Sequence, residues 1–299
     1  MATIGIDIMN MLFNGTLTGA VYALIAMGYS LVYGVGGIMN LSHGAYFMLT
    51  GYLLLWMLQS PFFLGLEWLT VIIALIVITV IGGLTFLLLI KPLQDSHVAV
   101  VIATFGLAFL LEQIVIISPS GTEVWSIGQL EVLQGFTMVL GYPIVHQYVF
   151  LIIMSIIIVL LFALFINKSR LGKSIRAVSQ DREAAELMGI NSNRILLYTV
   201  MISALLAGVA AFMYLPGASL DGPAMGWGYL TNSFAIVILG GMGSLVGSVV
   251  GAFIVGYIIQ FTNVFIPNGP SWAHLVPIII IVIILLIRPQ GLFGKKELR

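Results

Sequence analysis

The sequence predicts an all-α fold, a polytopic transmembrane helical bundle with about eight to nine spans, some of them interrupted or re-entrant. Hydrophobic residues make up 61% of the 299 residues and charged residues 7%, against roughly 25% charged in a soluble domain. Apolar stretches of about 20 residues, enough to cross a ~30 Å hydrocarbon core, recur along the chain. We therefore expect residues 1–299 to form a single integral membrane domain.

The first apolar segment, residues 8–32, is expected to be a retained span, because no basic region or cleavage signal precedes it. Its glycines predict a face that packs closely against another helix. A glycine-rich break at residues 34–37 follows, before Asn40, Ser42 and His43, and a helix is expected to resume over 45–58. Further spans are predicted over residues 70–90, 98–117, 148–166, 195–214, 245–265 and 274–287.

A second glycine-rich break, residues 240–244, follows an apolar segment at 229–239 that is too short to cross a bilayer. Paired interruptions favour a binding site or pathway, because irregular backbone at membrane depth is tolerated only around a cavity or inside protein. Close packing of glycine-rich helices explains the same residues without a ligand. Both interpretations stay open.

Glu112 is a further candidate, since a carboxylate is costly in lipid and is expected to face the bundle or water. A purely structural hydrogen bond to a neighbouring helix explains it equally well. The candidate pathway residues are Asn40, Ser42, His43, Glu112, Gly241 and Ser244.

Basic residues predict the orientation. The loop 168–194 carries six of the eleven lysines and arginines, and cytoplasmic loops are enriched in these residues. This loop, the turn at Lys91 and the tail 295–299 are therefore predicted to be cytoplasmic. The loop 118–147, which contains Glu123 and Glu131, is predicted to lie outside and to include a short strand at 137–140. With nine crossings of the membrane the N-terminus lies outside the cell. With eight crossings, one of the two termini would move to the other side of the membrane.

Within the basic loop, residues 183–189 have the pattern of a short helix. Ser179 is a candidate N-cap, and Gly189 suits the end of a helix. Ala184, Leu187 and Met188 fall on one face. No core of the same chain is expected nearby, so we expect a partner to cover this face.

The pattern Glu-Ala-Ala-x-x-x-Gly of residues 183–189 resembles the coupling segment of ABC importer permeases, the helix that docks on the ATP-hydrolysing subunit. Three further motifs are Tyr33-Gly34-Val35 before Asn40-Leu41-Ser42-His43-Gly44, the run Gly240-Gly241-Met242-Gly243-Ser244, and Arg288-Pro289-Gln290-Gly291-Leu292-Phe293. Together these three motifs resemble the branched-chain amino acid permeases in particular. One departure from the general importer pattern is residues 199–202, which lack the proline of an I-x-L-P element and fit the branched-chain subgroup better.

The resemblance implies a permease subunit that moves branched-chain amino acids inward, driven by ATP hydrolysis on ABC partner subunits. It also implies a paralogous second permease, an extracytoplasmic substrate-binding protein, and a place among the lipids of a prokaryotic cytoplasmic membrane. Urea, amides and other amino acids are alternative substrates. The residues that it assigns to ATPase coupling are Asp181, Arg182, Glu183, Ala184, Ala185, Glu186, Leu187, Met188, Gly189 and Ile190.

A self-sufficient, ion-coupled transporter is the alternative from another class, with Glu112 or a histidine as the coupling group, but it leaves the coupling-like helix unexplained. An intramembrane enzyme would need a cluster of catalytic side chains that the sequence does not offer. The chain has no cysteine, and its histidines lack metal-ligand spacing. Gly172-Lys173-Ser174 lacks the leading glycine of a P-loop, since Asn167 stands there. The sequence thus predicts no enzyme, no cofactor, no metal and no nucleic-acid partner.

Overall fold

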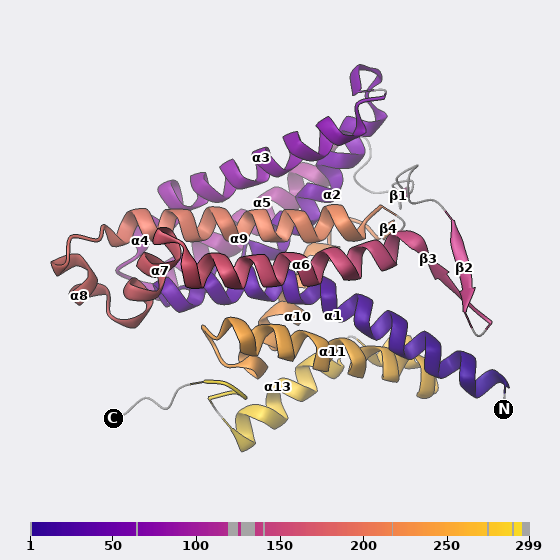
Figure 1. Cartoon of the computed structure of the whole chain (residues 1–299). Helices are drawn as coiled ribbons and strands as arrows, with labels where there is room; N and C mark the ends of the chain where they lie inside the picture. Colours follow the sequence, from indigo (N-terminus) through magenta and orange to yellow (C-terminus); the bar gives the residue numbers. More distant parts are fainter. Residues whose placement is uncertain are drawn as a thin grey trace.

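The computed structural model describes residues 2–63, 65–118, 125–126, 135–139, 141–216, 218–273, 275–288 and 290–294. In this part of the chain, helices form the bundle, and two short strand pairs lie at one end of it (Figure 1). The predicted all-α, polytopic fold is confirmed.

The elements follow the predicted order closely, with boundaries that differ by a few residues. In chain order they are α1 (Ala2–Gly36), α2 (His43–Gln59), η1 (Pro61–Phe63), α3 (Glu67–Thr85), the π-helical turn η2 (Phe86–Ile90), α4 (Lys91–Leu93), α5 (His97–Ile117), β1 (Trp125–Ser126), β2 (Phe136–Val139), β3 (Tyr142–Val145), α6 (His146–Lys168), α7 (Arg170–Gln180), α8 (Arg182–Leu187), α9 (Ser192–Tyr214), β4 (Ser219–Leu220), α10 (Met225–Gly240), α11 (Leu245–Phe265), α12 (Gly269–Ala273) and α13 (Val276–Ile287).

Six segments of the described chain are long and apolar enough to cross a membrane: Gly5–Gly36, Glu67–Leu93, His97–Ile117, His146–Lys168, Ser192–Tyr214 and Leu245–Phe265. Three other apolar helices, α2, α10 and α13, have only 17, 16 and 12 residues. At 1.5 Å per residue, α13 is about 18 Å long and cannot cross a ~30 Å core alone. The last predicted span is thus shorter than expected, and the count of eight to nine stays approximate.

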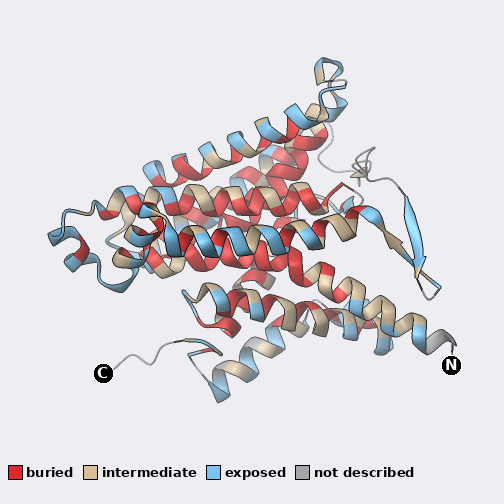
Figure 2. Ribbon diagram, in the orientation of Figure 1, coloured by how far each residue is buried: buried red, intermediate tan, exposed pale blue. Residues whose placement is uncertain are grey.

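α1 lies at the centre of the bundle, and Figure 2 shows its middle turns buried on all sides. It packs against α6, α9, α10 and α11. A Cβ atom at Gly19 would lie 2.6 Å from the Phe253 ring of α11, and one at Gly256 would meet the backbone of Gly15 and Gly19. The predicted close-packed glycine face of the first helix is confirmed, with α11 as its partner.

Segments that were predicted to lie on opposite sides of the membrane are found at opposite ends of the helical bundle. Figure 1 shows α7, α8 and the α4 turn together at one end, with the start of α1 and the β2–β3 hairpin at the far end. Phe136 pairs with Val145 in that hairpin, which confirms a short strand near 137–140. Glu123, Glu131 and the basic tail 295–299 lie outside the described residues.

Candidate functional site

The first break, residues 37–42, joins α1 to α2 through a turn that side chains hold in place. Gly37 has a positive φ of 62°, and Asn40 and Ser42 are buried. The Ser42 N–H donates to Asn40 Oδ1 at 3.1 Å, and the Ser42 hydroxyl donates to the same oxygen at 2.6 Å. An asparagine oxygen that accepts from the N–H two residues later mimics a backbone turn. The Asn40 side chain therefore replaces the hydrogen bonds that the helix loses here.

His43 opens α2 and connects it to two other helices. Its Nε2 lies 2.9 Å from the Ile25 carbonyl oxygen of α1, and its Nδ1 lies 3.0 Å from Ser203 Oγ of α9. Because a carbonyl oxygen only accepts, we assign the proton of the neutral ring to Nε2, and Nδ1 then accepts from the Ser203 hydroxyl. The ring also fills the space beside Gly28, where a Cβ would lie 3.1 Å from His43 Cε1.

The second break, residues 241–244, is held by backbone contacts. Gly241 and Gly243 have φ values of 99° and 83°, which L side chains rarely adopt. Ser244 caps α11 by accepting from the Gly247 N–H at 3.1 Å. A Cβ at Gly34 would lie 3.1 Å from the Gly243 Cα, so the second break packs against the last turn of α1. The predicted start of the first break at residue 34 is wrong, because α1 continues through Gly36.

The C-terminal segment 291–294 docks on the second break. The Leu292 N–H donates to the Leu239 carbonyl at 2.8 Å, and the Phe293 N–H donates to the Gly240 carbonyl at 3.0 Å. The last carbonyls of an α-helix have no partner within the helix. The tail supplies the missing donors for α10 and lies so close that a Cβ at Gly241 would collide with the Gly294 backbone.

Glu112 of α5 faces the bundle. Its Oε2 accepts a hydrogen bond of 2.7 Å from Trp227 Nε1 of α10. A small cavity beside this pair is also lined by Leu41 of the first break, and the Leu41 N–H donates to Thr104 Oγ1 of α5 at 3.1 Å. Glu112 and the first break therefore border the same small space between α2, α5 and α10.

The short helix α8 begins at a different cap from the one predicted. Asp181 is the N-cap, and its side chain accepts from the Ala184 N–H at 2.9 Å. Ser179 lies inside α7, where its hydroxyl donates to the Arg176 carbonyl. Asp181 has extended backbone angles, which an N-cap needs. The predicted Ser179 cap is wrong because α7 continues to Gln180.

The predicted end of α8 is confirmed. Gly189 has a φ of 83°, and the Ile190 N–H donates back to the Ala185 carbonyl at 3.0 Å, as in a left-handed helix end. Ala185 is buried against its own chain, whereas Leu187 and Met188 are 89% and 82% exposed. One side of α8 thus packs against its own chain, and the other side exposes large apolar side chains.

Arg182 fastens α8 to the rest of the chain. Its guanidinium donates to Glu186 at 3.4 Å, to Gln94 Oε1 at 3.4 Å and to Asn193 Oδ1 at 3.2 Å. These partners lie on α8 itself, after α4 and on α9. A force applied to the exposed face of α8 would therefore reach two membrane-spanning segments directly.

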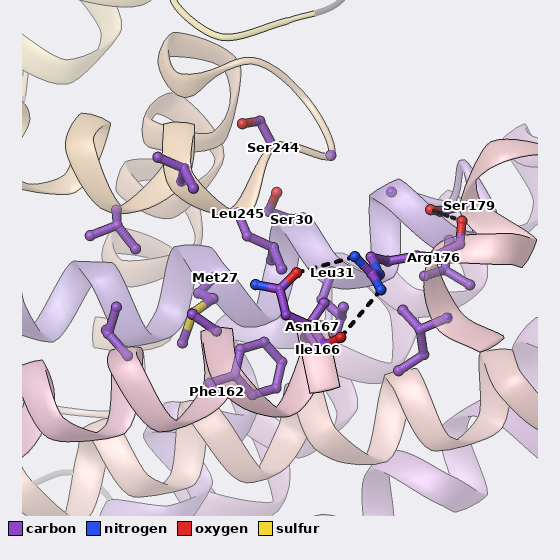
Figure 3. Close-up of a pocket in the computed structure, with 18 of the residues that line it drawn as sticks. Met27, Ser30, Leu31, Phe162, Ile166, Asn167, Arg176, Ser179, Ser244 and Leu245 are labelled. Carbon is purple, nitrogen blue, oxygen red and sulfur yellow. Dashed lines mark hydrogen bonds between the residues drawn. The ribbon is translucent and has the colours of Figure 1, made fainter. Parts of the chain in front are cut away.

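A cavity of about 440 Å³ lies on the other side of α1, between α6, α7 and α11 (Figure 3). Ser244 is at its rim and is joined there by Ser30, Asn167 and Arg176. Asn40, Ser42 and His43 do not line this cavity. Asn40 and Ser42 bond to each other, and His43 contacts α1 and α9.

The family model described as "Branched-chain amino acid transport system / permease component" matches residues 11–285. This chain belongs to that permease family. The permease is 29% identical over 296 residues to the high-affinity branched-chain amino acid transport system permease protein BraD of Pseudomonas aeruginosa, covering 96% of this chain and 95% of BraD. It is 26% identical over 302 residues to LivH of Escherichia coli (strain K12), again covering 96% and 95%.

More distant relatives of the permease have other names. The ribose import permease protein RbsC of Escherichia coli (strain K12) is 29% identical over 262 residues, covering 83% of this chain and 76% of RbsC. Among solved structures, PsaBC from Streptococcus pneumoniae in complex with Fab matches 94% of this chain and 92% of its own, with 17% identity and a TM-score of 0.49.

Sequence reasoning found both breaks of the permease but missed what holds them. Ser203 and Trp227 supply the partners of His43 and Glu112. The sequence signals for these two partners were indirect. Small residues follow Ser203, as at a close helix–helix contact, and the indole N–H of a buried tryptophan usually finds a hydrogen-bond acceptor. The motif that ends in Phe293 was noticed, but its contact with the second break was not.

Proposed function

We propose that this permease is the membrane subunit of an ABC importer that carries leucine, isoleucine and valine across the cytoplasmic membrane of a prokaryote. The names of BraD and LivH support this substrate class, since their similarity extends over 96% of the chain. RbsC matches a smaller share, 83%. Residues 1–299 act as one permease domain, and the loop 168–194 is its cytoplasmic coupling element.

The observation that carries this proposal is the exposed face of α8. Large apolar side chains such as Leu187 and Met188, projecting together from an anchored helix, mark a protein interaction site. An ATP-hydrolysing subunit that binds residues 181–190 would satisfy this surface. ATP-driven movement would then pass through Arg182 to α9 and to the α4 turn. A paralogous permease and an extracytoplasmic binding protein complete the proposed importer.

We place the solute path on the side of α1 that faces α2, α5 and α10. There Glu112 and Trp227 border a small cavity next to the first break. Asn40, Ser42 and His43 would fix the shape of this break, and Gly241 and Ser244 would fix the second. A path with few polar groups suits solutes whose side chains are apolar.

The test is leucine uptake into vesicles that contain the permease with its ATPase subunits and binding protein. Leu187→Asp places a charge in the proposed docking surface and should reduce ATP-driven uptake at least tenfold. The matched control is Gln180→Asp, an exposed position just outside the coupling segment, which should keep wild-type uptake. Both variants should insert and purify like the wild type, because neither side chain is buried.

Full uptake by Leu187→Asp and by Met188→Asp would contradict the coupling role. Uptake without ATP would identify a self-sufficient transporter. Uptake of ribose in place of leucine would keep the coupling role and change the substrate class.

A further inference from the structure

A groove runs along one side of α1, with α6 and α11 as its walls; we call it the α6–α11 groove. It consists of two cavities, one of about 440 Å³ and one of about 160 Å³. Val159 and Val249 border both of them, so the two cavities are adjacent. On α1 the groove extends from Ala20, near the middle of the helix, to Val35, at the end where α7 lies.

The shape of the groove suits an extended chain. The 15-residue separation along α1 corresponds to roughly 22 Å, which exceeds the ~15 Å that one leaflet contributes to a ~30 Å hydrocarbon core. The side chains along this length are mostly aliphatic, as an acyl chain requires.

The polar end of the groove carries positive charge. Arg176 is a lining residue, and the lining includes no carboxylate. The Arg176 guanidinium donates to the Asn167 Oδ1 and carbonyl oxygens at 3.2 and 3.3 Å. Over the ranges that the structure covers, no carboxylate lies within ion-pair distance of Arg176. Its other N–H groups are therefore free to bind an anion.

The helix that carries Arg176 exposes several basic side chains beside the groove. Gly172, Ile175 and Val178 of α7 pack against the bundle, while Arg170 and Lys173 are exposed on the same side as Arg176. Basic residues next to the ends of spanning helices attract the anionic lipids of the cytoplasmic leaflet. With the loop 168–194 on the cytoplasmic side, as proposed above, Arg176 lies at the end of the groove where such a headgroup would be.

Apart from Ser244 of the second break, which lies at its rim, the groove is separate from the proposed solute path. Successive residues of a helix are rotated by about 100°, so Met27, Ser30 and Gly34 lie on the side of α1 opposite to Ile25 and Gly28. The latter pair contacts His43. A free amino acid would also leave its ammonium group without an anionic partner in the groove.

We propose that the α6–α11 groove binds one anionic phospholipid of the cytoplasmic leaflet. Arg176 and the Asn167 amide hold its phosphate, and one acyl chain lies along α1 between α6 and α11. The lipid would fill the gap between these helices next to the second break.

The experiment is native mass spectrometry of the purified full-length permease in detergent, with palmitoyl-oleoyl phosphatidylglycerol or phosphatidylcholine of the same chains. Wild type should retain phosphatidylglycerol preferentially. Arg176→Gln should weaken that retention at least about tenfold, as expected for the loss of a direct hydrogen bond between charged groups. The matched control is Lys173→Gln on the same helix, which does not line the groove and should lose only the general attraction of a basic residue near the membrane surface, about fivefold at most. Ala163→Trp should fill the groove and block retention of both lipids.

Three results would overturn the proposal. The first is equal retention of the two lipids, or unchanged retention by Arg176→Gln, which would indicate ordinary annular lipid. The second is displacement of phosphatidylglycerol by leucine, or loss of leucine uptake in Ser155→Val, which would make the groove a solute route; Ser155 lines the deeper cavity. The third is disulfide formation between two copies of Ala163→Cys in this cysteine-free chain, which would make the groove a subunit interface. The lipid-retention, leucine-displacement and disulfide results do not depend on the ATPase assignment.

Discussion

The second helix break packs against the end of α1 that leads into the first, yet the two breaks are held by different means. At the first break, the side chains of Asn40, Ser42 and His43 make the hydrogen bonds. At the second break, glycines with positive φ let backbone approach backbone, and the C-terminal segment 291–294 caps the end of α10. The first break therefore depends on hydrogen bonds from side chains. The second depends on glycines, which have no side chain and so let the backbone segments approach each other.

The comparison shows why both kinds of sequence signal occur in one structure. A broken helix in a membrane must satisfy its free N–H and C=O groups within the protein. Polar side chains can do this where there is room for them, as beside Gly28. Where three backbone segments meet, near Gly34, Gly241 and Gly294, any Cβ is an obstacle, and the backbone itself must supply the hydrogen bonds.

The largest effect is expected from Gly241→Val, which adds bulk at the second break. Its φ of 99° is outside the range of β-branched residues, and its Cβ would meet the Gly294 backbone. We expect a loss of about 3 kcal/mol in the free energy of unfolding, measured by thermal or denaturant unfolding in detergent. Gly228→Val is the control, because the space around Gly228 is open, and it should cost less than about 1 kcal/mol. Equal stability of the two variants would show that the tail does not pack on Gly241.

An intermediate effect is expected at the first break from His43→Ala. The change removes two hydrogen bonds, worth about 0.6 kcal/mol each on average between membrane helices, and leaves a cavity beside Gly28. The expected cost is about 2 kcal/mol in the same unfolding assay. His97→Ala, at an exposed position, should be nearly neutral. If His43→Ala proved as mild as the control, the side-chain account of this break would fail.

The smallest effect is expected from Ser244→Ala, which removes a side chain at the break that depends least on side chains. Loss of the N-cap bond to the Gly247 N–H should cost about 1 kcal/mol. Comparing the thermal midpoints of Ser244→Ala and His43→Ala tests which break depends more on its side chains. A larger loss of stability for Ser244→Ala than for His43→Ala would show that the second break is the more dependent one, contrary to our account.

The sequence alone determined the features that depend on local chemistry. Long apolar runs predicted the membrane-spanning helices, and glycine runs predicted that the chain breaks near both places. Basic residues predicted that α7, α8 and the α4 turn lie at the same end of the bundle. Gly189 marked the end of α8 because a left-handed backbone there requires it. These properties follow from the hydrogen-bonding and conformational limits of a few neighbouring residues.

The tertiary structure alone decided which distant groups meet. The cap of α8 moved from Ser179 to Asp181 because α7 extends farther than local propensity suggested. The partners of His43, the docking of residues 291–294 on the second break and the α6–α11 groove all depend on how α1 packs against its neighbours. Such contacts join residues separated by up to 160 positions, as His43 and Ser203 are, and no local pattern encodes a distance in space.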